Sequence, residues 1–159
     1  MKEKVKKDFD YIWDIIELPV IIIIGYSLLD LFFSISTYIS KIIPANIVGI
    51  LLTIFAFGLI GYNSIKEGNT PKEASKYGAY AGVIVGLASA IIGIITFYYY
   101  PEKLADAIQK AAESGADVSM VQTFMKIGVY ASFIISPAIN AAIGYLIARI
   151  SANVFNKKK

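Results

Sequence analysis

One acidic residue lies in the middle of a long apolar run, where a carboxylate could bind a proton or a cation. Asp30 follows two leucines and is followed by Leu31, Phe32 and Phe33. A charge at the centre of a bilayer costs about 2.5–3.5 kcal/mol on insertion scales, so such residues usually face the protein interior and often mark ion or proton paths. Three interpretations of Asp30 follow. It is a hydrogen-bonded core residue that fixes the register of the helices, a proton- or cation-responsive site in a small transporter, or a residue that contacts a partner subunit or a lipid.

Four other polar residues are expected at a depth similar to that of Asp30. At 1.5 Å per residue, Thr53, Ser89 and Ser136 lie about 15–17 Å from the expected cytoplasmic ends of their helices, and Asn140 lies one turn nearer to that end. This depth is close to the middle of a hydrocarbon core about 30 Å thick. No Lys or Arg is expected at this depth, so hydroxyl and amide groups are the available hydrogen-bond partners of the carboxyl group. The candidate mid-membrane polar site consists of Asp30, Thr53, Ser89, Ser136 and Asn140.

The apolar residues come in four blocks that could each cross a membrane. Of the 159 residues, 57% are hydrophobic and 17% are charged, whereas a soluble domain is about half apolar and about a quarter charged. A membrane-spanning helix needs about 20 mostly apolar residues. The sequence therefore predicts an all-α integral membrane protein, with one domain over residues 1–159 that forms a four-transmembrane-helix bundle. The expected spans are about 18–39, 45–64, 78–100 and 124–150.

Two shorter amphipathic helices are expected outside these spans. Apolar residues at helical spacing, such as Phe9, Trp13 and Ile16, give residues 8–17 one apolar face. We expect an N-terminal amphipathic interfacial helix there; the alternative is a solvated cap that packs on the loops. The loop 101–119 between the third and fourth spans shows a similar pattern, which predicts a short helix on the membrane surface.

Capping signals predict where the third and fourth helices begin. Thr70, Pro71 and Glu73 fit an N-cap, a proline at the first helical position and a glutamate at the third. The third helix is therefore expected to begin before the membrane, near Pro71. Asp117 or Ser119 is the expected N-cap of the fourth helix.

The distribution of Lys and Arg predicts the orientation in the membrane. Cytoplasmic segments carry an excess of these residues. With both termini in the cytoplasm, eleven lie inside and four outside, so we expect a multi-pass protein of the cell membrane with cytoplasmic N- and C-termini. The inside residues are Lys2, Lys4, Lys6, Lys7, Lys66, Lys72, Lys76, Arg149, Lys157, Lys158 and Lys159, and the outside residues are Lys41, Lys103, Lys110 and Lys126.

Small residues recur every four positions in the third and fourth spans. In lipid there is little hydrophobic drive between helices, so close packing through small residues gains importance. The pattern predicts that these two helices pack backbone to backbone within one chain; the alternative is that one stripe forms a homodimer. The candidate helix-packing residues are Gly78, Gly82, Gly86 and Gly93 in the third span, and Gly128, Ser132 and Gly144 in the fourth.

The residue types that are absent or scattered exclude several kinds of chemistry. Cys and His do not occur, which excludes disulfides, thiolate or imidazole metal sites, and catalysis by Cys or His. The acidic residues outside the spans are few, and their spacing is typical of the solvated face of a helix. We therefore predict no enzyme activity, no metal and no cofactor. The net charge is +3, and the basic residues are at chain ends and in loops. This placement is typical of basic residues beside anionic lipid headgroups. It does not indicate binding of nucleic acid.

The chain resembles the small multidrug-resistance transporters in helix count and in the carboxylate of its first span, Asp30. The resemblance implies a dimeric transporter that uses this acid. The chain differs from that family in having Asp in place of Glu, in the residues around the acid, in length and in the outer loop. We therefore expect a structural or accessory subunit of a membrane assembly, with a small proton- or cation-coupled transporter or channel as the alternative. The expected partners are the lipid bilayer and either a second copy of the chain or another membrane subunit.

Overall fold

The described parts of the chain fold into α-helices joined by short turns. The structure, a computed structural model, describes residues 2–34 and 45–157. Its helices are α1 (Lys2–Phe33), α3 (Ala45–Lys66), α4 (Pro71–Tyr99), α5 (Glu102–Glu113) and α6 (Val118–Asn156). Four of them, all except α5, are long and apolar enough to cross a membrane. The predicted all-helical chain with four candidate spans is thus confirmed, while the end of the first predicted span, 35–39, lies outside the described residues.

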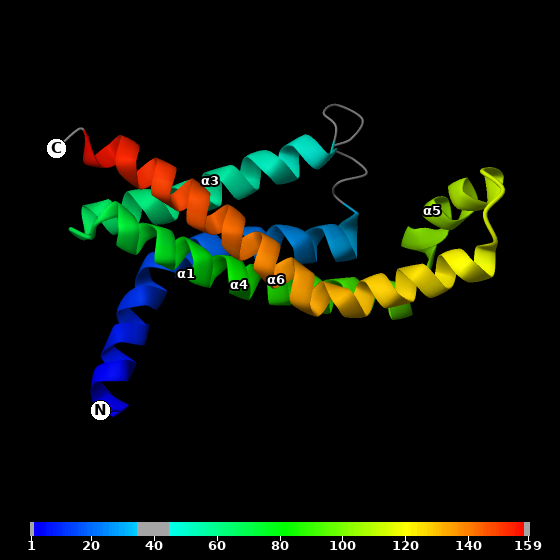
Figure 1. Cartoon of the computed structure of the whole chain (residues 1–159), viewed down its shortest axis with the longest axis horizontal. Coiled ribbons are helices and arrows are strands. Elements are labelled where there is room, and N and C mark those ends of the chain that lie inside the picture. Colours follow the sequence, from blue (N-terminus) through cyan, green and yellow to red (C-terminus); the bar gives the residue numbers. More distant parts are fainter. Residues whose placement is uncertain (1, 35–44, 158–159) are drawn as a thin grey trace.

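The four long helices pack side by side around one apolar core. In Figure 1 both chain ends and the turn between α3 and α4 lie at one end of the bundle, and α5 lies at the other. The core forms where α1, α3, α4 and α6 meet, with Ile16, Phe57, Ile60, Val85 and Ala148 buried together. α6 shares its most extensive contact with α4 and a smaller one with α3.

The N-terminal segment does not form the separate helix that the sequence predicts at residues 8–17. Residues 8–17 belong to α1, which continues through Pro19 into the apolar span. Figure 1 shows the first part of α1 turned steeply away from the direction of the bundle, and a proline inside a helix is a common cause of such a bend. Ile15 and Ile16 are buried in the core, and Trp13 packs against it. Part of the apolar face of this segment therefore contacts the bundle itself.

The turn between α3 and α4 is fixed by the predicted capping residues. Thr70 is the N-cap of α4, and its Oγ1 accepts a hydrogen bond from the Glu73 backbone N–H at 3.3 Å. The Glu73 carboxylate accepts one from the Thr70 backbone N–H at 2.8 Å. These two bonds form a capping box, with Pro71 at the first helical position. The Asn69 amide donates to the Tyr11 hydroxyl at 2.6 Å, which ties the turn to α1.

Glycines bring the backbones of α4 and α6 into direct contact. A Cβ placed on Gly78 would meet the carbonyl oxygen of Gly144, and one on Gly82 would meet the carbonyl oxygen of Asn140. A Cβ on Gly86 would meet the backbone of Pro137. No side chain fits at these positions, so the two helices can approach this closely only through glycine.

α3 packs against the same part of α6 by similar means. A Cβ on Gly61 would meet the carbonyl oxygen of Ala148, and the Phe57 ring lies beside Gly144. The Ser151 hydroxyl donates a hydrogen bond across the interface to the Gly58 carbonyl oxygen at 2.7 Å. α6 is therefore held on two sides, by α3 and by α4, along its C-terminal half.

The contact between α4 and α6 ends part-way along both helices. Gly93 and Gly128 continue the small-residue patterns, yet nothing lies within 4 Å of a Cβ placed on either one. Pro137 lies inside α6, and Figure 1 shows α6 changing direction along its length. The predicted contact therefore does not extend to Gly93 and Gly128, because the two helices diverge beyond Gly86.

We predict that Gly82→Leu destabilises the bundle. The leucine would force α4 away from the Asn140 backbone, and such overpacking costs about 1–3 kcal/mol. Thermal or denaturant unfolding in detergent micelles measures the loss. Gly25→Leu is the matched control, because nothing lies within 4 Å of a Cβ at Gly25. Equal unfolding midpoints for the two variants would contradict the proposed role of the backbone contact.

Candidate functional site

Asp30 lies near the end of its helix and not at the middle. α1 ends at Phe33, and Ser34 follows with a positive φ of 50°. The apolar stretch of α1 begins at Phe9, which places Asp30 in its last turn. The predicted mid-span depth of Asp30 in a membrane stays a prediction. The side chain is half-buried.

Thr53 and Asn140 face each other across a shallow groove between α3 and α6. This groove has a volume of about 360 Å³. The Thr53 hydroxyl donates to the Gly49 carbonyl oxygen at 2.8 Å, and the Asn140 amide donates to the Ser136 carbonyl oxygen at 2.9 Å. Both groups thus bond within their own helices. Their polar atoms are satisfied without a partner on a neighbouring helix.

Ser89 and Ser136 line a different groove, on the side where α4 and α6 diverge. That groove has a volume of about 390 Å³ and also includes Ser132. The Ser132 hydroxyl donates to the Val129 carbonyl oxygen at 2.6 Å, again within one helix. The five residues of the predicted polar layer are therefore divided between two grooves and the end of α1. Asp30 lines neither of the two grooves.

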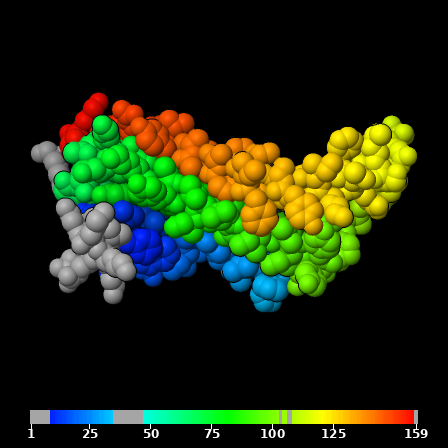
Figure 2. All heavy atoms as spheres, turned by 60° about the horizontal axis from the view of Figure 1, so that its bottom comes forward, coloured from blue at the N-terminus to red at the C-terminus, as the bar shows by residue number. Residues whose placement is uncertain are grey.

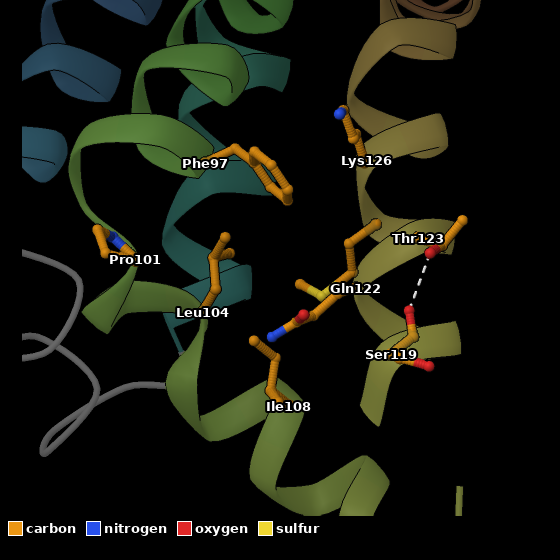
Figure 3. Close-up of a pocket in the computed structure, with 9 residues that line it drawn as sticks. Phe97, Pro101, Leu104, Ile108, Ser119, Gln122, Thr123 and Lys126 are labelled. Carbon is orange, nitrogen blue, oxygen red and sulfur yellow. Dashed lines mark hydrogen bonds between the residues drawn. The ribbon is translucent and has the colours of Figure 1, made fainter. Parts of the chain in front are cut away.

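A further cavity lies where α5 folds back toward α4 and α6. It has a volume of about 460 Å³. In Figure 3, Phe97 of α4, Leu104 and Ile108 of α5 and Gln122 of α6 point into the same space. Phe97, Leu104 and Met125 also line the groove that holds Ser89. The two cavities are therefore neighbours with shared walls, and we call them together the α5 groove.

The start of α6, which forms one wall of the α5 groove, is capped by Asp117. One carboxylate oxygen accepts hydrogen bonds from the Ser119 hydroxyl and the Ser119 backbone N–H, both at 2.7 Å, and from the Met120 backbone N–H at 3.4 Å. The hydroxyl bond from Ser119, followed by the two backbone bonds, lowers the pKa of Asp117 below its ordinary value. Asp117 is thus the N-cap, one of the two predicted candidates, and it fixes Ser119 at the groove.

A pair of tyrosines joins the diverging helices beside the same groove. The hydroxyl groups of Tyr98, in α4, and Tyr130, in α6, lie 2.7 Å apart and share a hydrogen bond. The sequence predicted neither this bond nor the one from Ser151. Neither pair shares a local motif, since each joins residues far apart in the chain.

Among the side chains that the structure describes, no group of three or more carboxylates is placed to hold a metal ion. Comparisons of the chain with models of protein families, with curated proteins and with solved structures give no significant match. The fold and the side-chain geometry are therefore the basis for a functional conclusion.

We predict that Ser151→Ala weakens the contact between α3 and α6. Hydrogen bonds between membrane helices contribute about 0.6 kcal/mol on average and about 1.7 kcal/mol at most, so a small drop in unfolding free energy is expected. Ser132→Ala is the control, because that hydroxyl bonds within its own helix. A larger loss for Ser132→Ala than for Ser151→Ala would contradict the assignment.

We also predict an acid-sensitive start of α6. Because folding lowers the pKa of Asp117, its contribution to stability is complete above the unfolded-state pKa and is lost as the pH falls through the folded-state pKa. Hydrogen exchange of the first turn of α6, compared between neutral and acidic pH, should show this loss. Asp117→Asn retains a capping oxygen but does not titrate, so its exchange should lack this pH response. An unchanged pH response in that variant would assign it to another group.

Proposed function

We propose that this chain is a non-enzymatic structural or accessory subunit of a membrane assembly. The observation that carries the proposal is the filled interior of the bundle. α4 and α6 meet through backbone atoms at Gly78, Gly82 and Gly86, and Phe57 fills the space beside Gly144. A transporter needs a site that can reach both sides of the membrane in turn. A bundle joined backbone to backbone at its centre is better suited to a fixed shape.

The division of the polar residues supports the same choice over a transporter. A coupled site would bring Asp30 together with Thr53, Asn140 or the serines in one water-accessible space. Instead, one groove holds Thr53 and Asn140, the other holds Ser89 and Ser136, and Asp30 lines neither of these two grooves. Thr53 and Asn140 bond within their own helices, as expected of polar groups that are satisfied locally in a membrane.

We place the protein in the cell membrane with both termini in the cytoplasm. An even number of spans puts the two chain ends on the same side, which is how they lie in Figure 1. That end carries the larger share of Lys residues, as the positive-inside rule requires. In this arrangement the first turns of α1 and the short helix α5 lie at opposite membrane interfaces, and α5 is on the outside.

The partners that fit this role are the bilayer and one further membrane subunit, either a second copy or another protein. α6 offers a long apolar surface away from the bundle, with Phe124 65% and Ile134 79% exposed. Exposed apolar side chains of this kind suit lipid tails or a neighbouring helix. We propose no nucleic acid partner, because the basic residues are at chain ends and in loops.

The proposal is tested by measuring ion movement in liposomes that contain the purified protein. The parent protein and Asp30→Asn should both give proton and cation fluxes equal to those of empty liposomes at several pH values. Ser89→Ala serves as a second variant from the predicted polar layer. A flux above background in the parent that Asp30→Asn abolishes would overturn the structural role and establish the transporter.

A further inference from the structure

The α5 groove combines an apolar floor with a polar and cationic end. Its deeper part is lined by Ala90, Gly93, Gly128 and Val129 between α4 and α6. Its other end, beside α5, includes Ser119, Gln122 and Lys126. We propose that this groove binds one anionic phospholipid, with an acyl chain between α4 and α6 and the phosphate group near Lys126. This inference requires only that the four helices span a membrane, and it holds whether or not the chain is a structural subunit.

The length of the groove matches one leaflet of a bilayer. Along α6 the groove extends from Ser119 to Ser136, which is about 25 Å at 1.5 Å per residue. Half of a bilayer, including its polar headgroup region, is about 20–22 Å thick. The two parts of the groove have volumes of about 460 and 390 Å³. A lipid aligned with the helices would therefore extend through both parts.

The polar groups lie where a lipid headgroup would be. α6 has 39 residues and is about 58 Å long, so it extends well beyond a hydrocarbon core of about 30 Å. Its first turns, which carry Ser119 and Gln122, are next to α5 and extend past the ends of the neighbouring helices in Figure 2. Lys126 follows one turn deeper. A lysine at this level can extend its ammonium group to the interface and attract a phosphate.

The apolar part of the groove must be filled by hydrocarbon. Nothing lies within 4 Å of a Cβ at Gly93 or Gly128, so the space beside both backbones is open. At this depth a bilayer offers acyl chains and no water. Leu104 and Ile108 of α5 cover the polar end of the groove from outside, which would limit the exchange of a bound chain with the surrounding lipid.

A third helix fits this groove less well than a lipid does. A helix with its side chains is about 10–12 Å wide, and α4 and α6 would have to separate to admit it. The hydrogen bond between Tyr98 and Tyr130, at 2.7 Å, joins the two walls of the groove and opposes that separation. An acyl chain is much thinner and needs no such movement. Insertion of a partner helix is therefore the alternative that the experiment must exclude.

Native mass spectrometry of the purified full chain tests the groove with two added lipids, dioleoyl phosphatidylglycerol and dioleoyl phosphatidylcholine. We expect one retained phospholipid per chain. A Lys near the membrane surface contributes about 1 kcal/mol of attraction to anionic lipid, so phosphatidylglycerol should bind about fivefold more tightly. Equal binding of the two lipids by the parent, or an added mass equal to a second copy of the chain in place of lipid, would overturn the proposal.

Two groove variants and one control assign the binding to this groove. Gly128→Leu should weaken the binding of both lipids by about tenfold or more, because the leucine occupies the space of the acyl chain and would overpack the groove. Gly25→Leu, whose Cβ is equally unobstructed but on α1, should bind as the parent does. Gly93→Leu, on the facing wall, gives an independent result if Gly128→Leu fails to fold. Parent-like binding by folded Gly128→Leu or Gly93→Leu would refute the site.

A further pair of variants tests the role of the Lys126 charge separately from that of the apolar part of the groove. Lys126→Gln should remove the preference for phosphatidylglycerol while keeping the binding of phosphatidylcholine. Lys110→Gln is the control, because Lys110 is on α5 near the same end of the protein, is exposed and does not line the groove. A preference that survives Lys126→Gln, or is lost equally in Lys110→Gln, would show that the phosphate does not lie at Lys126.

Discussion

The bundle depends on the close approach of α4 and α6, which is limited only by backbone atoms. Gly78, Gly82 and Gly86 face the α6 backbone from Gly144 to Pro137. In a bilayer, lipid tails are as apolar as leucine side chains, so helices gain little from apolar burial alone and depend on close van der Waals packing. Glycine at each contact point brings many backbone atoms within that range. α3 uses the same part of α6 through Gly61, and the buried face of α1 fills the remaining side of the core.

The α5 groove forms where the close contact between α4 and α6 ends. At Gly86, the facing wall of α6 is the backbone of Pro137. From Pro137 toward Val118, α6 continues as part of a helix that is longer than the membrane requires. α4 and α6 diverge there, so that Gly93 and Gly128 face open space. The amphipathic helix α5 then lies over the gap with Leu104 and Ile108 toward it. The α4–α6 pair is therefore closely packed along one half and open along the other.

The sequence was sufficient for features that depend on local or one-dimensional patterns. Apolar block length predicted the four candidate spans, and Thr70 with Glu73 predicted the capping box of α4. Features that depend on where two helices diverge could not be predicted from the sequence. The sequence pattern of small residues treats Gly82 and Gly93 alike, although Gly82 contacts α6 and Gly93 does not. The prediction of a separate helix at 8–17 is wrong, because these residues and Pro19 belong to one continuous helix, α1.

The position of Asp30 shows why a residue's place in a helix has to be counted from both ends. Counted from Leu18, Asp30 falls near the middle of the predicted first span. Counted from the other end, it is in the last turn of α1, which ends at Phe33. An acidic side chain in a last turn opposes the helix dipole, at a cost of about 0.3–1 kcal/mol. The larger cost of about 2.5–3.5 kcal/mol belongs to a charge at the centre of a bilayer, and that depth of Asp30 stays a prediction.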